Sequence, residues 1–125
     1  MAPLLLDTHV ALWWFTAHPR LTPQMQDTIA RSPCHLSAAS IWEVAIKHRL
    51  GKLTVAPHTL IELAQAANMH CLSVTAEHCA ATAELPLLHG DPFDRLLIAQ
   101  ARIERLRLLT CDAALSGYGG DIQVV

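Results

Sequence analysis

The sequence lacks closely spaced cysteines and an excess of either charge. Its four cysteines stand far apart with no C-x-x-C pair, so neither a zinc knuckle nor a redox motif is present, and reduced thiols are the simplest interpretation. Nine Lys and Arg against eleven Asp and Glu give a net charge of −2 with His neutral. Non-specific nucleic-acid binding through a broad positive field is therefore not expected, although local basic clusters exist.

Long apolar runs, repeats and linkers are missing as well. No segment approaches the roughly eighteen apolar residues of a membrane span, and the first residues carry no basic region typical of a secretory signal. We therefore expect a cytoplasmic protein without a membrane segment. The 125 residues are expected to form a single domain spanning residues 1–125. The hydrophobic fraction of 52% leaves apolar surface that a partner can cover.

Short apolar runs alternate with helical patterns along the chain. The segments predicted to be strands, not all of them apolar, are residues 3–6, 34–37, 70–74, 108–112 and 122–125. The predicted helices include residues 8–17, 24–30, 59–67 and 75–83, one around Trp42 that Ser37 or Ser40 caps, and one that begins at Pro92. This alternation predicts an α/β sandwich with a mostly parallel sheet.

The stretch HGDPFDRLLIAQA, residues 89–101, joins a short loop with two aspartates to an apolar helix. Asp91 can cap this helix, Pro92 suits its first position, and the helix dipole favours Asp94 in the first turn. The apolar residues that follow predict burial of the first turns. A carboxylate at the edge of a core needs a cation, a hydrogen-bond network or a metal. Alternatively, the two aspartates serve only as a cap.

Four acids occupy comparable places in this pattern. Asp7 and Asp112 each follow an apolar strand, whereas Glu43 and Asp94 lie in the first turns of helices. In a parallel sheet, the strand carboxyl ends and the starts of the following helices meet at one edge, so all four are expected to converge. Ionised carboxylates share a small site only when cations neutralise them, and oxygen ligands suit Mg²⁺ or Mn²⁺. Such a site suits phosphoryl chemistry.

Simpler interpretations exist for single residues. Glu43 precedes Lys47 by four positions, which also predicts a salt bridge on a solvated helix face. Asp112 is either an outer ligand acting through water or no more than a helix cap. His9 is the histidine nearest the acids, but no H-E-x-x-H or other ligand spacing occurs, so a histidine metal site is not expected.

Together these motifs resemble the PIN domain family and, within it, the VapC-type ribonuclease toxins. The resemblance rests on LLLDTH, LSAASIWEVAIKHRLGKL, LPLLHGDPFDRLLIAQA and LLTCD. It implies a three-layer α/β/α sandwich, PIN-like, whose acids bind Mg²⁺ or Mn²⁺ and hydrolyse RNA. Carried over by position, the catalytic and metal-binding acids are Asp7, Glu43, Asp94 and Asp112.

Two further residues support this set in the resemblance. Thr8 matches the hydroxyl residue that follows the first acid and is expected to hold a metal-bound water. Asp94 keeps the family spacing to Ala99 and Ala101, so we prefer it to Asp91 as the third acid and keep Asp91 as the cap.

The resemblance also implies partners. These are an RNA substrate such as tRNA or rRNA, a small VapB-like antitoxin that covers the active-site groove, and a second copy in a homodimer. Four basic residues are expected to contact RNA phosphates: Lys47, Arg49, Lys52 and Arg95. The alternative is that they are only solvated charges on helix surfaces. The alternative function is a non-catalytic PIN-like protein that binds RNA or a partner, against which the intact acids argue.

Overall fold

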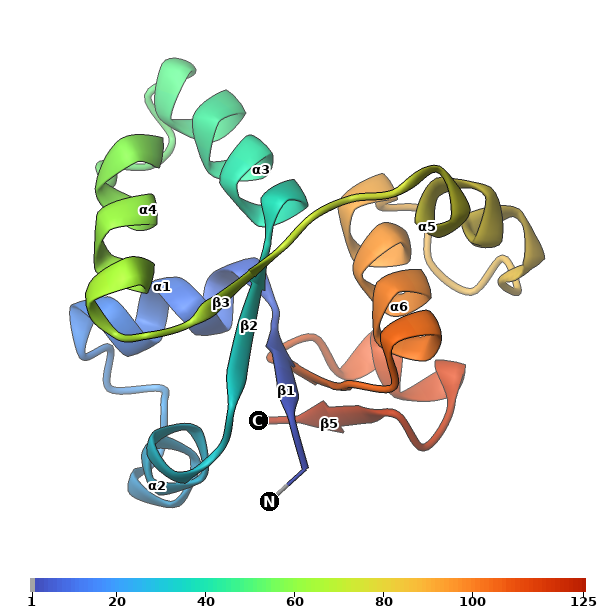
Figure 1. Cartoon of the computed structure of the whole chain (residues 1–125), viewed down its shortest axis with the longest axis horizontal. Coiled ribbons are helices and arrows are strands. Elements are labelled where there is room, and N and C mark those ends of the chain that lie inside the picture. Colours follow the sequence, from blue (N-terminus) through green and yellow to red (C-terminus); the bar gives the residue numbers. More distant parts are fainter. Residues whose placement is uncertain (1) are drawn as a thin grey trace.

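A five-stranded parallel sheet forms the centre of the protein, and helices cover both of its faces (Figure 1). The computed structural model describes residues 2–125. The strands are β1 (Leu4–Leu6), β2 (Cys34–Ser37), β3 (His70–Leu72), β4 (Arg107–Thr110) and β5 (Ile122–Val124). Their order is β3-β2-β1-β4-β5, so the chain first builds outward from β1 in one direction and then in the other.

The helices divide between the two faces of the sheet. One side carries α1 (Thr8–Thr16), α2 (Pro23–Arg31), α3 (Ala38–Arg49) and α4 (Pro57–Ala66). The other side carries α5 (Ala76–Ala81), α6 (Pro92–Glu104) and the 3₁₀ segments η1 (Thr82–Glu84) and η2 (Ala113–Tyr118). This arrangement confirms the predicted α/β sandwich. Within residues 2–125, no helix is both long and apolar enough to span a bilayer.

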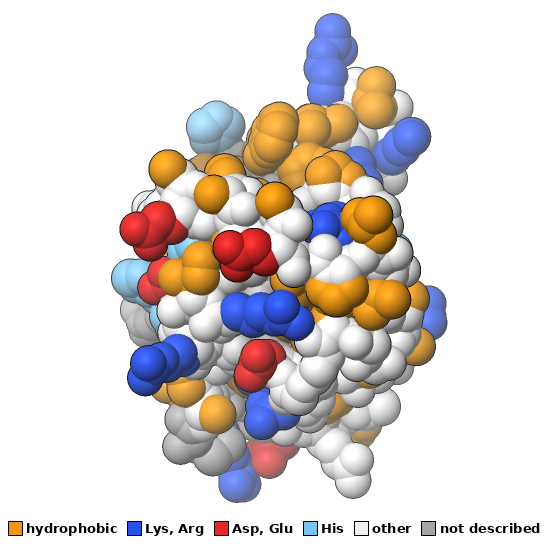
Figure 2. Space-filling model, turned by 90° about the vertical axis from the view of Figure 1, so that its right-hand side faces the viewer, with side chains coloured by type: hydrophobic (Ala, Val, Ile, Leu, Met, Phe, Trp, Pro, Cys, Tyr) orange, Lys and Arg blue, Asp and Glu red, His pale blue; other side chains and the backbone are white. Residues whose placement is uncertain are grey.

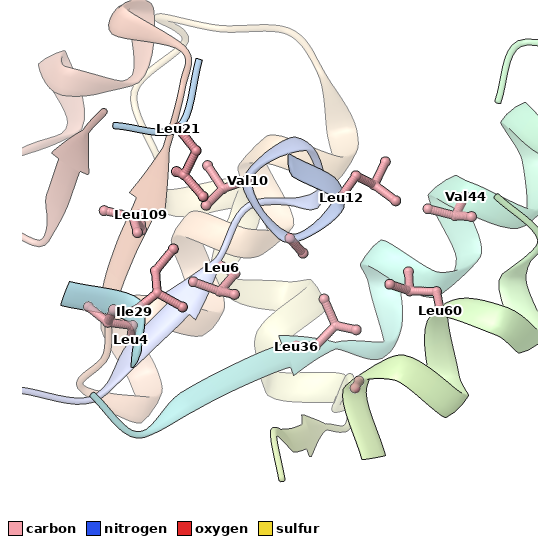
Figure 3. Close-up of a cluster of buried hydrophobic side chains, with 12 residues drawn as sticks. Leu4, Leu6, Val10, Leu12, Leu21, Ile29, Leu36, Val44, Leu60 and Leu109 are labelled. Atoms are coloured by element: carbon pink, nitrogen blue, oxygen red, sulfur yellow. The ribbon is translucent and has the colours of Figure 1, made fainter. Parts of the chain in front are cut away.

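Successive leucines of β1 feed two separate cores because neighbouring side chains of a strand point to opposite faces. Leu4 and Leu6 pack with Val10 of α1 in the first core, which Figure 3 shows. Leu5 packs with Leu97 of α6 in the second. All three leucines of β1 are at most 2% exposed, which is why this central strand has no polar residue before Asp7.

The helix boundaries follow local chemistry. Ser37 accepts a hydrogen bond from the Ala39 N–H (3.0 Å), so Ser37 rather than Ser40 caps α3. At the other end of α3, Gly51 adopts a φ of 75°, a left-handed conformation that glycine reaches without strain. Most predicted strands and helices match the observed ones to within a residue or two at each end, where boundaries are least certain.

One expectation about α6 was wrong. Its buried part is residues 97–101, whereas residues 93–96 of the first turn are only partly buried. The apolar residues predict burial of the first turns, but the first turn borders a pocket and only the following turns lie on the sheet.

Candidate functional site

A pocket of about 390 Å³ opens at the carboxyl ends of β1 and β4. These neighbouring strands lie where the strand order reverses direction, the place where parallel α/β sheets leave a crevice. The pocket is lined by Asp7, His9, Trp13, Arg20, Glu43, Lys47, Asp91, Asp94, Cys111 and Asp112. The structure thus brings together all four acids that the sequence predicted to converge, although they come from four separate elements.

Asp7 directly follows β1, the central strand of the sheet, and is only 4% exposed. Its backbone N–H donates to the Leu109 carbonyl (2.9 Å), and the Thr110 hydroxyl donates to its Oδ2 (2.6 Å). Burial raises the pKa of the Asp7 carboxyl, while the Thr110 hydrogen bond opposes that rise. Sequence reasoning missed Thr110; the available signal was a polar residue that directly follows two apolar residues at the end of a strand.

Glu43 is also buried, at 5% exposure, and two neighbours hold its carboxylate. The Thr8 hydroxyl donates to Oε1 (2.7 Å), and Lys47 Nζ donates to Oε2 (2.7 Å). The salt bridge considered as an alternative therefore exists, but it lies at the pocket and not on a solvated face. The hydrogen bond with Glu43 is the main reason that the pKa of Lys47 is raised. In this structure, Thr8 positions Glu43.

Asp94 and Asp112 meet around a histidine, His89, that no ligand spacing in the sequence indicates. His89 Nε2 lies 2.8 Å from Asp94 Oδ2 and 3.7 Å from Asp112 Oδ2. Asp112 Oδ1 also accepts from the Ala114 N–H (2.9 Å), so Asp112 caps η2 and lines the pocket at the same time. Burial, followed by the charge of Asp7, raises the pKa of Asp94 to about 6.

Asp91 is the cap that the sequence predicted. Its Oδ1 accepts from the backbone N–H groups of Phe93 (2.8 Å) and Asp94 (3.1 Å). This cap sets the start of α6 and thereby the position of Asp94. Because Asp91 also lines the pocket, its charge adds to the negative potential there.

Arg95 holds the segment before α6. Its guanidinium donates to the carbonyls of Pro86 (2.9 Å) and Thr82 (2.7 Å) and, at longer distances, to those of His89 and Leu85. Both terminal nitrogens are therefore engaged within the protein, which argues against contacts of Arg95 with RNA phosphates. Arg49 and Lys52 are exposed.

Removing the Asp94 charge is expected to stabilise the metal-free protein at neutral pH. The pKa of Asp94 is about 6 in the folded protein against an ordinary value of 3.8, so the folded state binds this proton more tightly than the unfolded chain. That stabilising contribution is fully present below about pH 4 and is lost as the pH rises through about 6. In chelator, Asp94→Asn should have a higher Tm than the wild type at about pH 7.5.

The gain in Tm should shrink toward about pH 4, where Asp94 is protonated in both states. Thermal unfolding at the two pH values measures it. If the difference in Tm between Asp94→Asn and the wild type is the same at both pH values, burial of the Asp94 charge is not its cause.

The fold and the carboxylate pocket together define a PIN-class protein. The profile of the PIN domain family matches residues 4–120, and the chain belongs to this family. Ribonuclease VapC22 from Mycobacterium tuberculosis (strain ATCC 25618 / H37Rv) is a relative that is 32% identical over 121 residues, which cover 94% of this chain and 93% of that protein.

Solved structures with the same fold come from toxin–antitoxin systems. VapBC2 from Rickettsia felis, bound to a DNA fragment from its promoter, matches with a TM-score of 0.70 and 14% identity over 98% of this chain and 97% of that chain. A toxin–antitoxin complex from Klebsiella pneumoniae matches with a TM-score of 0.68 and 18% identity over 97% of this chain and 96% of that chain. At these identities the likeness shows the fold.

Proposed function

We propose that this chain is a divalent-metal-dependent endoribonuclease and acts as the toxin of a toxin–antitoxin pair in the cytoplasm. The observation that carries the proposal is the convergence of Asp7, Glu43, Asp94 and Asp112 on one pocket. Membership of the PIN domain family and the ribonuclease activity named for the VapC22 relative support it.

The donor set fits Mg²⁺ or Mn²⁺. The pKa values of Asp7 and Asp94 are both raised because burial, and for Asp94 the charge of Asp7, disfavours the anions. A hard dication relieves this repulsion, and carboxylate oxygens are the ligands it prefers. Asp7 and Asp94 would hold it, with Asp112 beside them and Glu43 oriented by its bonds to Thr8 and Lys47. Bound there, the ion supplies activation of water for attack on a phosphodiester.

The exposed basic residues at the end of α3 supply phosphate contacts in this proposal. Arg49 and Lys52 are exposed there, and Lys47 lies closer to the acids. Lys52→Ala is expected to reduce the slope of log kcat/KM against log salt concentration by about 0.7, the value for one released counterion on a single strand. Cleavage kinetics across a salt series measure it. Arg105→Ala is the matched control, because Arg105 lies at the C-terminal end of α6, whereas the pocket is at its N-terminal end. This variant should keep the wild-type slope.

A protein partner has an apolar surface to bind. Trp42 and Ile46 of α3 and Leu50, the residue that caps its C-terminal end, stand four residues apart and are 61%, 38% and 64% exposed. The Trp42 ring packs edge-on against Phe93 at 5.2 Å, and each of the two is followed in the chain by an acid that lines the pocket, Glu43 and Asp94. Figure 2 shows hydrophobic and basic side chains gathered at the top of the molecule, where the end of α3 projects. We assign this apolar surface to a VapB-like antitoxin, because the structural neighbours are toxin–antitoxin complexes.

A second copy of the chain is the other protein partner in the proposal. We propose a homodimer that forms away from the pocket, so that RNA or the antitoxin still reaches the acids. Sedimentation velocity of the purified chain measures the state directly, and a monomer at all concentrations would remove the homodimer from the proposal.

Cleavage of total tRNA and rRNA is the test of the nuclease. Protein freed of any bound antitoxin is incubated with RNA in Mg²⁺ or Mn²⁺, then in chelator, and beside an Asp7→Asn variant. We expect cutting that needs the metal and is lost in the variant, because Asp7 is the most buried of the four acids. Cutting that survives both changes would come from a contaminant, and no cutting by any preparation would favour the non-catalytic PIN-like alternative.

A further inference from the structure

A second group of potential metal ligands, which includes a histidine and a cysteine, lies in the same pocket. One potential ligand atom from each of Asp7, His9 and Cys111 lies within 4.8 Å of the other two. Asp7 follows β1, His9 belongs to the first turn of α1, and Cys111 follows β4. Since β1 and β4 are neighbouring parallel strands with Leu6 opposite Leu109, their carboxyl ends necessarily bring these residues together.

The thiolate and the imidazole in this group are softer ligands than the four carboxylates of the site described above. A thiolate, an imidazole and a carboxylate are the ligand types of zinc sites, and thiolate and imidazole are poor ligands for Mg²⁺. Three protein ligands also leave one tetrahedral position open for water. The Thr110 hydroxyl bonds to Oδ2 of Asp7, but each carboxylate oxygen has a second lone pair, so Asp7 can still bind a cation.

The geometry needs only a small adjustment to hold zinc. Ligand atoms around a tetrahedral zinc ion stand roughly 3.5 Å apart, as follows from metal–ligand distances of about 2.0–2.3 Å. His9 is exposed and Cys111 is partly buried, so the His9 ring has room to turn toward the other two donors. The backbone of Asp7 stays fixed by its bond to Leu109.

We propose that Asp7, His9 and Cys111 form a Zn²⁺ site that competes with the carboxylate site for Asp7. On binding, the Cys111 thiol releases its proton to solvent as the thiolate–zinc bond forms. Zinc held there takes Asp7 away from a hard dication and so inhibits RNA cleavage. The inhibition rests on the proposed nuclease function, whereas the binding of zinc does not.

Direct metal binding tests the site without any RNA. The protein, with its affinity tag removed and its thiols reduced, is titrated with Zn²⁺ against a chromophoric chelator and separately with Co²⁺. We expect tight binding of one zinc per chain and a thiolate-to-cobalt charge-transfer absorption. Cys111→Ser and His9→Asn should each weaken zinc binding by at least about tenfold, and Cys111→Ser should remove the charge-transfer absorption.

Two matched variants identify the ligands. Cys79→Ser changes an exposed cysteine elsewhere and should bind zinc like the wild type. His89→Asn probes the other histidine at the pocket, which lies with Asp94 and Asp112. Zinc affinity that falls in His89→Asn but not in Cys111→Ser, or a cobalt complex without thiolate absorption, would overturn the proposal.

The inhibition is measured by adding Zn²⁺ to cleavage reactions that contain Mg²⁺ or Mn²⁺. Cys111→Ser, with its fold checked by thermal unfolding, should need at least about tenfold more zinc for half-inhibition than the wild type. Equal sensitivity of the two proteins would overturn the regulatory role. If no preparation cleaves RNA, the nuclease proposal fails while the titrations still decide the zinc site.

Discussion

Asp94→Asn is expected to lower kcat/KM for RNA cleavage by at least about a hundredfold, the upper end of what losing an outer partner costs a metal site. Asp94 lies at the pocket, with its pKa raised to about 6 by burial and by the charge of Asp7. The amide keeps the shape of the side chain but cannot supply the negative charge that holds a dication. Cleavage of the same RNA at saturating Mg²⁺ or Mn²⁺ measures the loss.

Asp91→Asn is the matched control, because both residues begin α6 and only their roles differ. Asparagine caps helices as well as aspartate does, so this variant keeps the bonds to Phe93 and Asp94 and should lose much less activity. A larger loss in Asp91→Asn than in Asp94→Asn would assign the third acid of the family to Asp91. Since Asp94→Asn is expected to be the more stable protein without metal, unfolding does not explain its loss of activity.

Arg95→Met is expected to destabilise the protein by about 3 kcal/mol, because the guanidinium donates to four backbone carbonyls and to Tyr118 Oη. Methionine keeps the apolar part of the side chain but cannot donate, so the short bonds to Pro86 and Thr82 are lost. Each hydrogen bond from a charged group contributes about 1.5–3 kcal/mol, although Tyr118 Oη still donates to Pro86 and the Leu85 N–H to Thr82. For a domain of this size the Tm should fall by roughly 10 °C.

Arg49→Met provides the comparison, since Arg49 is an exposed arginine on α3 and its replacement should leave the Tm nearly unchanged. If Arg95 instead contacts RNA, Arg95→Met would keep the wild-type Tm and reduce the salt dependence of cleavage. Loss of stability together with loss of activity would show that the loop before α6 positions Asp94 through Arg95.

The fold was predictable because its signals are local and agree with one another. β1 is a short apolar run, and caps such as Ser37 and Asp91 mark where helices begin. The convergence of the four acids was also predictable, because all strands of the sheet are parallel and their carboxyl ends share an edge. The spacing of the apolar residues did not reveal that the first turn of α6 borders a pocket. The burial of that turn depends on which other helices and strands pack against it, and the spacing within α6 does not contain this information.

The sequence by itself determined the α/β class, the mostly parallel sheet and the identity of the acids, because periodicity, caps and strand-end residues are properties of neighbouring positions. Only the tertiary structure decided which side chains meet across elements. The bond from Thr110 to Asp7, the approach of His89 to Asp112, and the meeting of His9 with Cys111 all join residues from different segments. No local pattern encodes such contacts, because they arise when packing brings separate strand ends to the same edge.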